Sequence, residues 1–385
     1  MGKPDQFMIT LDNPSGVCYS GQLVTGKVIL VTKKNVKTNG IRLDARGCAY
    51  VHWSETRKKI GAGTSNSVMD TETIYFSAGE NYFDFRIPLT SGKENLGPGK
   101  YEYVFQFTLP INCATTYEGS YGHIRYTLTA VIDRPWKFDH KSILPFTVIS
   151  NVDLNRISNI GEPLVSAAQK QLGALFWKSG NLSATIELNR RGFVPGELMA
   201  PKLIVQNDSG RKVKTVKLSL KQYTAFRATR LGSWHEKRQL TTVAEAVSND
   251  RIGGHSSRTF VFENFRVPAL PPDQLHCSIM QMWYMLEAEI DPSGLSSDLH
   301  IQVPIIIGSI PLSQAGQSSN QSNMVEADSV PPSAPPQELY PDLPPPSYSE
   351  CVHGRKSVED EAGEHNYGTK TYAPVYPSFS EPQKS

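Results

Sequence analysis

The chain lacks the short motifs that identify the common classes of enzyme. It has no GxSxG nucleophile turn, no Walker phosphate loop and no GxGxxG dinucleotide loop. His235-Glu236 is not followed by the second histidine of a zinc-binding HExxH helix. The nine histidines are scattered, as expected for structural or solvated side chains. The sequence therefore predicts a protein that is not an enzyme and that holds no metal and no cofactor.

Cysteine is scarce, and its spacing suits neither cross-links nor metal binding. The five cysteines form no CxxC pair, and their odd number leaves one without a disulfide partner. They stand at positions 18, 48, 113, 277 and 351. This usage is typical of reduced thiols in the cytosol, and it argues against a disulfide framework or a zinc site.

Long hydrophobic runs are also missing. The longest mostly apolar stretch, residues 301–312, is too short to span a bilayer and contains two prolines. Residues 1–12 show no basic segment followed by an apolar one, so no secretory signal is predicted. We expect a soluble protein of the cytoplasm.

The chain does contain a long internal repeat. Residues 126–133 and 284–291, 158 positions apart, both read Tyr-x-Leu-x-Ala-x-Ile-Asp. This alternation sends every second side chain to one face of a strand. Three further pairs of similar segments run in the same order, and they are 21–23 with 196–198, 107–110 with 265–268, and 145–149 with 304–308. A repeat of this period predicts a duplicated domain, because solenoid units are far shorter.

Both copies read as successive β-strands. Segments rich in β-branched and aromatic residues alternate with Gly- and Asn-rich breaks, and in the first copy they cover 7–11, 23–31, 41–51, 73–76 and 101–109. The predicted fold class is therefore all-β, with two tandem β-sandwich domains. We place the domains at 1–150 and 176–310. Residues 151–175 are predicted to be a connector, with two or three helical turns over 164–172 after Pro163.

The last part of the chain, residues 311–385, has a different composition. It holds 12 of the 27 prolines, together with many Ser, Gln and Glu residues. Its 10 acidic and 4 basic residues give it a net charge of −6, so the rest of the chain carries +8. Such a segment buries too little apolar surface to offset the entropy lost on ordering. We predict a disordered, proline-rich tail.

One set of motifs is distinctive in its order and spacing. Residues 119–126 read Gly-Ser-Tyr-Gly-His-Ile-Arg-Tyr and lead to Asp133-Arg134-Pro135-Trp136, and residues 262–272 follow in the second half. These motifs resemble the α-arrestins, the arrestin domain-containing proteins, over residues of roughly 7–312. The resemblance implies an arrestin fold of two β-sandwich lobes with concave faces, joined by a short hinge.

The resemblance also implies a function. It suggests an adaptor that links membrane-protein cargo to WW-domain HECT ubiquitin ligases and so promotes cargo ubiquitination, endocytosis and sorting. Such a protein is cytoplasmic and is recruited to the plasma membrane and endosomes. Two alternatives share the fold, a signalling arrestin that works without a ligase and a retromer-like trafficking scaffold. The first predicts a clathrin-type Leu-rich acidic box in the tail, and none occurs between residues 311 and 385.

The tail carries the motif Pro345-Pro346-Ser347-Tyr348. Consecutive prolines favour the polyproline II conformation, in which three residues make one turn, so Pro345 and Tyr348 lie on the same face. Pro345, Pro346 and Tyr348 can then enter the aromatic grooves of a WW domain. A chance match in a proline-rich segment is the alternative. The resemblance favours binding, because α-arrestins carry a PPxY motif in this position.

Two other motifs in the tail are weaker. Pro374 and Tyr376 resemble a second PPxY site, but Ala373 replaces the first proline, so we expect weak WW binding or none. The motif Pro332-Ser333-Ala334-Pro335 matches the P-[ST]-A-P sequence that recruits the ESCRT-I complex. Its alternative reading is again a chance match among prolines.

The excess positive charge of the body suggests a basic binding surface. Arg211, Lys212 and Lys214 form one of the basic clusters, and they could bind acidic cargo tails or the anionic lipids of a membrane. A solvated strand face is the ordinary explanation for such residues. Nucleic acid is not expected as a partner, because aromatic residues do not interleave with the charges and the net charge is only +2.

Overall fold

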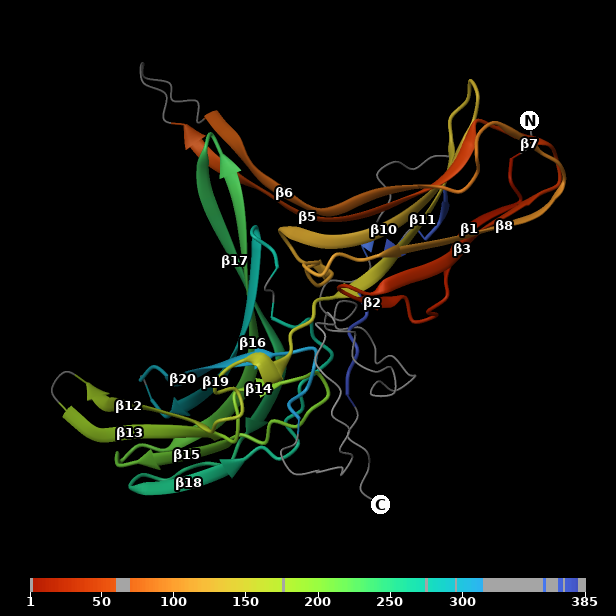
Figure 1. Ribbon diagram of the computed structural model, residues 1–385. Coiled ribbons are helices and arrows are strands. Elements are labelled where there is room, and N and C mark those ends of the chain that lie inside the picture. The colour runs from red at the N-terminus through yellow and green to blue at the C-terminus, as the bar shows by residue number, and fades with distance from the viewer. Residues whose placement is uncertain are drawn as a thin grey trace, which may run out of the picture.

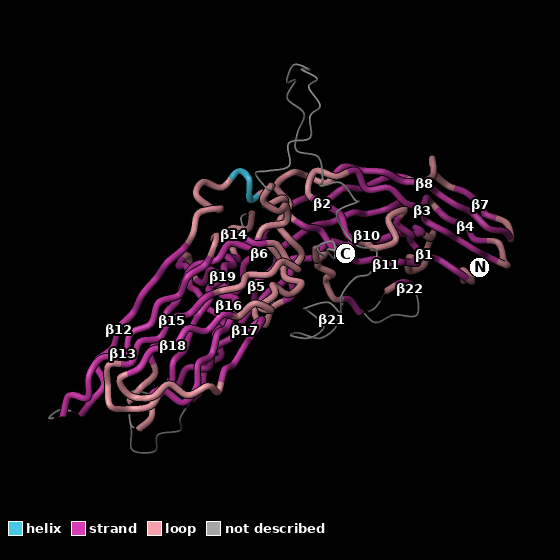
Figure 2. Tube along the Cα trace, turned by 90° about the horizontal axis from the view of Figure 1, so that it is seen from below, coloured by secondary structure: helices cyan, strands magenta, loops and turns pink. Residues whose placement is uncertain are grey.

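The structure is a computed structural model that describes residues 3–59, 70–174, 177–273, 276–294, 296–313, 356–357, 366–369 and 371–379. These residues form strands, apart from loops and one turn of 3-10 helix, Leu154–Arg156. Figure 2 shows this turn in cyan at the junction of two all-β lobes. Within the described residues, no helix has the length and hydrophobicity needed to cross a membrane.

The N-lobe is a sandwich of two sheets. Three strands form one sheet in the order β1-β3-β8, and they are Gln6–Leu11, Leu23–Thr32 and Gly99–Thr108. The facing sheet has the order β6-β5-β10-β11-β2, with bounds Asp70–Pro88, Gly40–Lys59, Gly122–Asp133, His140–Ile149 and Val17–Tyr19. Short strands complete the lobe, namely β4 (Val36–Thr38), β7 (Glu94–Leu96) and β9 (Tyr117–Glu118). The strands predicted in the first copy are all present, and β5 and β6 are longer than predicted.

The C-lobe repeats this plan. One sheet has the order β12-β13-β15-β18, with bounds Leu164–Ala174, Trp177–Leu188, Lys202–Asn207 and Ser256–Val261. The facing strands run β14-β20-β19-β16, with β17 paired to β16, and their bounds are Gly192–Phe193, Leu299–Ile307, Met280–Pro292, Val213–Arg230 and Ser233–Ser248. Where β16 meets β6, Thr229 pairs with Ser77, so the larger sheets of both lobes join into one 12-stranded sheet. Figure 1 shows β16 and β17 rising from the C-lobe to meet β5 and β6.

The register of the strands confirms the duplication. In the N-lobe, Tyr126 of β10 pairs with Phe146 of β11, and β2 adds to β11 in parallel. In the C-lobe, Tyr284 of β19 pairs with Ile305 of β20, and β14 adds to β20 in parallel. The two repeated tyrosines therefore occupy equivalent positions in two copies of one fold.

Both tyrosines are fully buried, and each hydroxyl meets a carbonyl of a neighbouring loop. The Tyr126 hydroxyl donates to the Ala114 carbonyl at 2.7 Å, and the Tyr284 hydroxyl donates to the Pro271 carbonyl at 2.6 Å. A buried carbonyl without such a donor carries the full cost of its lost hydration. Each tyrosine thus fixes the loop that enters its own lobe core.

The predicted helix over residues 164–172 is wrong. These residues belong to β12, which pairs along its whole length with β13. Their burial alternates with period two, since Leu164, Ser166 and Ala168 are less exposed than the residues between them. The Ala and Gln residues here favour a helix, but the backbone hydrogen bonds to β13 stabilise a strand more than this preference stabilises a helix. The connector therefore ends before Leu164, and the C-lobe begins there.

The equivalence of the two tyrosines makes a testable prediction. Tyr126→Phe and Tyr284→Phe should each lower the free energy of unfolding by about 1–3 kcal/mol, because each leaves a buried carbonyl unpaired. Urea unfolding of the whole chain measures the change. Tyr75→Phe is the control, since Tyr75 is exposed and should give no change. Parent-like stability in both buried variants would contradict the equivalence.

Candidate functional site

A segment of the tail packs against the N-lobe. Its strand β22, Asn366–Gly368, runs parallel to the start of β11, where Lys141 pairs with Asn366 and Ile143 with Gly368. The Tyr367 ring contacts the rings of Phe7 and His140 edge-on, at 6.0 Å and 5.7 Å between centroids. Residues 366–369 and 371–379 are called here the docked segment. Within the tail predicted to be disordered, this part makes specific contacts with the folded body.

Tyr376 is the buried anchor of the docked segment. Its side chain is only 2% exposed, and its hydroxyl donates to the Thr116 carbonyl at 2.9 Å. The hydroxyl of Thr147 accepts the backbone N–H of Val375 at 3.0 Å and lies 2.6 Å from the hydroxyl of Tyr372. Thr116 and Thr147 belong to the N-lobe, so this lobe supplies a polar, buried site for tail tyrosines.

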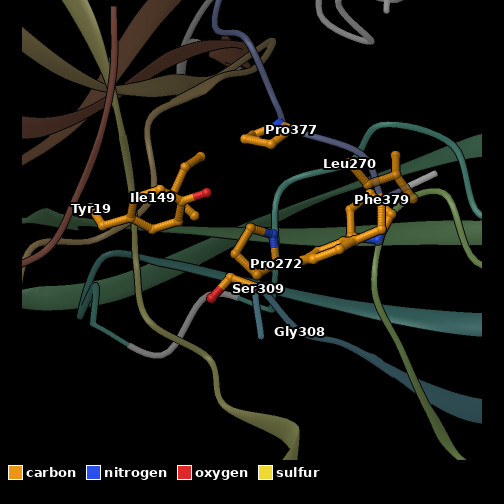
Figure 3. Close-up of a pocket in the computed structure, with 9 residues that line it drawn as sticks. Tyr19, Ile149, Leu270, Pro272, Gly308, Ser309, Pro377 and Phe379 are labelled. Atoms are coloured by element: carbon orange, nitrogen blue, oxygen red, sulfur yellow. The ribbon is translucent and has the colours of Figure 1, made fainter. Parts of the chain in front are cut away.

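The end of the docked segment reaches the C-lobe. Figure 3 shows Pro377 and Phe379 among side chains of both lobes, with Tyr19 and Ile149 from the N-lobe and Leu270 and Pro272 from the C-lobe. The backbone N–H of Phe379 donates to the Pro195 carbonyl at 2.8 Å. The space left in this pocket is about 10 Å³, room for one water molecule at most. The docked segment thus bridges the two lobes and nearly fills the pocket between them.

Gly196 permits this close approach. It has a φ of +95°, and a Cβ atom placed there would lie 1.9 Å from the Phe379 carbonyl oxygen. Gly21, its equivalent in the N-lobe, also has a positive φ of +81°. Both glycines are therefore required by the turn, but only Gly196 is also required by contact with the tail.

Comparison with known proteins identifies the fold family. Residues 7–155 match the family model described as "Arrestin (or S-antigen), N-terminal domain", and residues 178–312 match the corresponding C-terminal domain. The chain belongs to the arrestin family.

Relatives of the same family extend over most of this chain. An "Arrestin domain-containing protein 17" of Caenorhabditis elegans is 27% identical, and the match covers 98% of this chain and 99% of that protein. "Arrestin domain-containing protein 4" of Mus musculus is 29% identical, with 83% of this chain and 75% of that protein covered. "Arrestin domain-containing protein 1" of Homo sapiens is also 29% identical, with coverages of 88% and 73%. The resemblance inferred from the motifs is confirmed for the arrestin body.

Of the three proline motifs of this α-arrestin, two lie outside the described residues and one lies within them. Pro345, Pro346 and Tyr348 lie outside the described residues, and so do Pro332, Ser333, Ala334 and Pro335. Pro374 and Tyr376 are described, and both are buried. A WW domain could bind Tyr376 only after the docked segment had left Thr116. The second WW site stays a prediction, and in this arrangement its tyrosine is occupied by the N-lobe.

The sequence analysis missed the docking role of this segment. The tail holds a single phenylalanine, Phe379, and three of its five tyrosines, Tyr367, Tyr372 and Tyr376, lie within ten residues of one another. Such a local concentration of aromatic residues is a signal for docking. It is hidden when composition is averaged over all of residues 311–385.

The structure gathers Arg211, Lys212 and Lys214 at the turn that leads into β16. The backbone N–H of Lys212 donates to the Ser293 hydroxyl at 3.2 Å, and the Lys214 ammonium lies 3.7 Å from the Asp291 carboxylate. The nearby Lys217 pairs with Glu289 at 3.1 Å. Acidic neighbours thus neutralise part of this charge, and binding of cargo or lipid at these residues stays a prediction.

Among the described residues, one group has ligand atoms close enough to suggest a metal. Oxygen and nitrogen atoms of Glu287, Glu289 and His300 lie within 4.8 Å of one another. The Lys221 ammonium, however, already lies 2.6 Å from the Glu287 carboxylate, and both side chains are largely buried. Burial alone would raise the pKa of Glu287, yet hydrogen bonds from Lys221 and Gln302 lower it. The lysine takes the place that a cation would fill, so we assign no metal site here.

Docking of the tail can be tested by removing its anchor. Tyr376→Ala should detach the docked segment, because truncating a buried aromatic side chain costs about 3–5 kcal/mol. Hydrogen exchange should then speed up at the amides of Thr369, Val375 and Phe379, which donate to Ile143, Thr147 and Pro195. Tyr340→Ala, elsewhere in the tail, is the control. Unchanged exchange at Val375 in Tyr376→Ala would show that Tyr376 does not hold the segment.

Proposed function

We propose that this α-arrestin is an adaptor that links membrane-protein cargo to WW-domain HECT ubiquitin ligases. Through this link it promotes cargo ubiquitination, endocytosis and sorting, and it acts in the cytoplasm, at the plasma membrane and on endosomes. One observation carries the proposal, which is the presence of an arrestin body and the motif Pro345-Pro346-Ser347-Tyr348 in one chain. In this proposal the lobes hold the cargo, the motif recruits the ligase, and catalysis belongs to the ligase.

The physical properties of the motif suit recruitment. A stiff polyproline II segment has little conformational entropy to lose on docking, so a short sequence can bind. Its position in a separate tail allows the ligase to bind without competing for the surfaces of the lobes. Tyr376 would first have to leave its buried site at Thr116, which makes Tyr348 the stronger candidate for WW binding.

ESCRT-I recruitment through Pro332, Ser333, Ala334 and Pro335 is a further part of this proposal. It would bring ESCRT-I close to the PPxY motif in the same tail. ESCRT-I would then act after the cargo has bound and before it is sorted. A ligase-independent signalling arrestin or a retromer-like scaffold would use the lobes alone and would need neither motif. These alternatives predict that removal of the Tyr348 side chain leaves the function unchanged, whereas the adaptor role predicts its loss.

The adaptor role predicts a specific loss on mutation of Tyr348. Tyr348→Ala empties one WW pocket, and loss of a buried aromatic anchor commonly costs about 2 kcal/mol, or roughly thirtyfold in affinity. Pull-down of a WW-domain HECT ligase from cells and ubiquitination of a bound membrane protein should both fall. Tyr340→Ala is a matched control in the same tail and should behave as the parent.

Two results would count against the proposal. Undiminished pull-down with Tyr348→Ala would move recruitment elsewhere, and the double variant with Tyr376→Ala would then test the second site. Lost pull-down with unchanged cargo ubiquitination would support a scaffold that works without the ligase. Thermal unfolding of the body should be the same in the parent, Tyr348→Ala and Tyr340→Ala, because both positions are outside both arrestin domains.

A further inference from the structure

The loop between β10 and β11 exposes two aromatic side chains. Trp136 is fully exposed and Phe138 is 83% exposed, with the exposed Lys137 between them. Figure 1 shows this loop, in yellow, projecting from the end of the N-lobe. Large aromatic side chains are usually buried, so the exposure of two of them on one short projecting loop needs a reason.

The loop is held in shape from within. The buried Arg134 guanidinium donates to the Phe138 carbonyl through Nε at 2.7 Å and also through Nη2. The backbone N–H of Arg134 donates to the Asp139 carboxylate at 3.1 Å. Trp136 has a φ of +62°, a conformation that costs free energy for a residue with a large side chain. The exposed aromatics are therefore presented by a braced turn that accepts backbone strain.

Neighbouring loops add positive charge. Thr38 and Asn39 donate hydrogen bonds to the Asp133 carbonyl at 2.8 Å, which brings the exposed Lys37 to the base of the loop. Thr38 also pairs with Glu94 of β7, beside the exposed Lys93. Within the described part of the chain, Lys37, Lys93 and Lys137 make no salt bridge.

Three acidic residues near the loop, among those that the structure describes, are engaged or half-buried. The Asp133 carboxylate accepts from the Asn39 side chain at 2.8 Å, and the Asp139 carboxylate accepts from the Arg134 backbone. Glu94 is half-buried. Among the described residues named near the two rings, the exposed charged side chains are therefore lysines. Trp136, Lys137 and Phe138, with Lys37 and Lys93, are called here the aromatic tip.

We propose that the aromatic tip binds the surface of anionic membranes. Trp136 enters the interfacial layer, where its amphipathic indole ring is most stable, Phe138 buries its apolar ring beside it, and the lysines lie against the lipid headgroups. Each lysine near an anionic surface contributes attraction, and the aromatic rings supply apolar burial. The braced turn keeps the rings projecting, so little conformational entropy is lost on insertion.

The shape of the tip favours a bilayer over a protein partner. A stable protein interface needs about 800 Å² on each side, usually with a pocket for the anchoring residues. The aromatic tip is a narrow projection that ends in two rings, and a projection of this kind can enter a lipid layer without any complementary pocket. A protein that captured the tip would need a groove deep enough for both rings and lined with acidic residues that pair with the lysines. Failure of the parent to bind anionic vesicles would point to such a partner.

This inference deepens the proposed function, since an adaptor for membrane proteins works at a membrane surface, but its test needs neither ligase nor cargo. The whole chain is mixed with phosphatidylcholine vesicles, with and without phosphatidylserine, and binding is measured by sedimentation. The tip variant Trp136→Asn/Phe138→Ser should bind the phosphatidylserine vesicles at least about tenfold more weakly. Asparagine is chosen at 136 because it tolerates a positive φ, so the loop should keep its shape.

Matched variants separate the tip from other surfaces. Lys37→Glu/Lys137→Glu should weaken binding by about fivefold per charge, and more at low salt than at high salt. Trp234→Asn removes an exposed aromatic of the C-lobe, and Arg211→Glu/Lys212→Glu/Lys214→Glu reverses the C-lobe basic cluster. Trp234→Asn should bind vesicles as the parent does, and the cluster variant should lose less binding than the tip variant, because it keeps both rings of the tip. Urea unfolding should show the tip variant to be at least as stable as the parent, because both replaced side chains are exposed and asparagine tolerates the positive φ at position 136.

Fluorescence adds a readout that a merely structural role would not change. Bromine-labelled lipids should quench the parent, and Trp136→Phe should keep vesicle binding while losing most of that quenching. Parent-like vesicle binding by the tip variant would overturn the proposal, as would loss of binding only in the Arg211 cluster variant. A parent that binds no phosphatidylserine vesicles would also overturn it and would direct attention to an acidic protein partner.

The two functional proposals fail separately. Tyr348→Ala should lose ligase pull-down and keep vesicle binding, whereas the tip variant should keep ligase pull-down and lose vesicle binding.

Discussion

Each lobe depends on the pairing of one tyrosine-bearing strand with one neighbour. In both copies the tyrosine lies in the centre of a large sheet, with its ring in the core and its hydroxyl on a loop carbonyl. The ring excludes water from the carbonyl, and the hydroxyl replaces the hydrogen bond that water would have made. This single contact joins the core of the sandwich to the loop that closes it. The repeat of the contact, 158 residues apart, makes the two lobes alike.

The junction of the lobes combines hydrogen bonds with apolar contacts, such as the edge-on packing of the Tyr121 ring on Phe226. Tyr117 of the N-lobe lies 3.2 Å from the Thr224 hydroxyl of the C-lobe, and the Ser278 backbone donates to Glu80 at 2.8 Å. At the hinge, the Val152 backbone donates to the Ser309 hydroxyl at 2.8 Å. The docked segment adds a third connection, from Thr116 in one lobe to Pro195 in the other. Each lobe keeps its own buried core without the tail, so detaching the tail should loosen the junction without unfolding either lobe.

The proposed activities are spread over separate parts of the chain. Cargo binding belongs to the lobes, ligase recruitment to the motif that ends in Tyr348, and membrane contact to the braced loop around Trp136. None of these requires a catalytic group, and a partner can occupy one part without displacing a partner from another. The exception is the docked segment, where Tyr376 is both a tail tyrosine and a buried anchor of the N-lobe.

The sequence by itself determined the duplication, the all-β class and the arrestin family. Strand alternation and repeated motifs depend on residues that are close in sequence or regularly spaced. They can therefore be read from the order of residues alone, as the Tyr126 and Tyr284 segments show. The PPxY motif that we propose for ligase recruitment is also local, since it consists of consecutive residues. Three features depended on the tertiary structure. The sequence of residues 164–172 has no strong hydrophobic period, and these residues form a strand because β13 pairs with them. Tyr376 is buried because Thr116 and Thr147, more than 200 positions away, form a site for it. Trp136 is exposed because Arg134 holds the loop outward, and no sequence pattern states which aromatic residues a turn will leave in solvent.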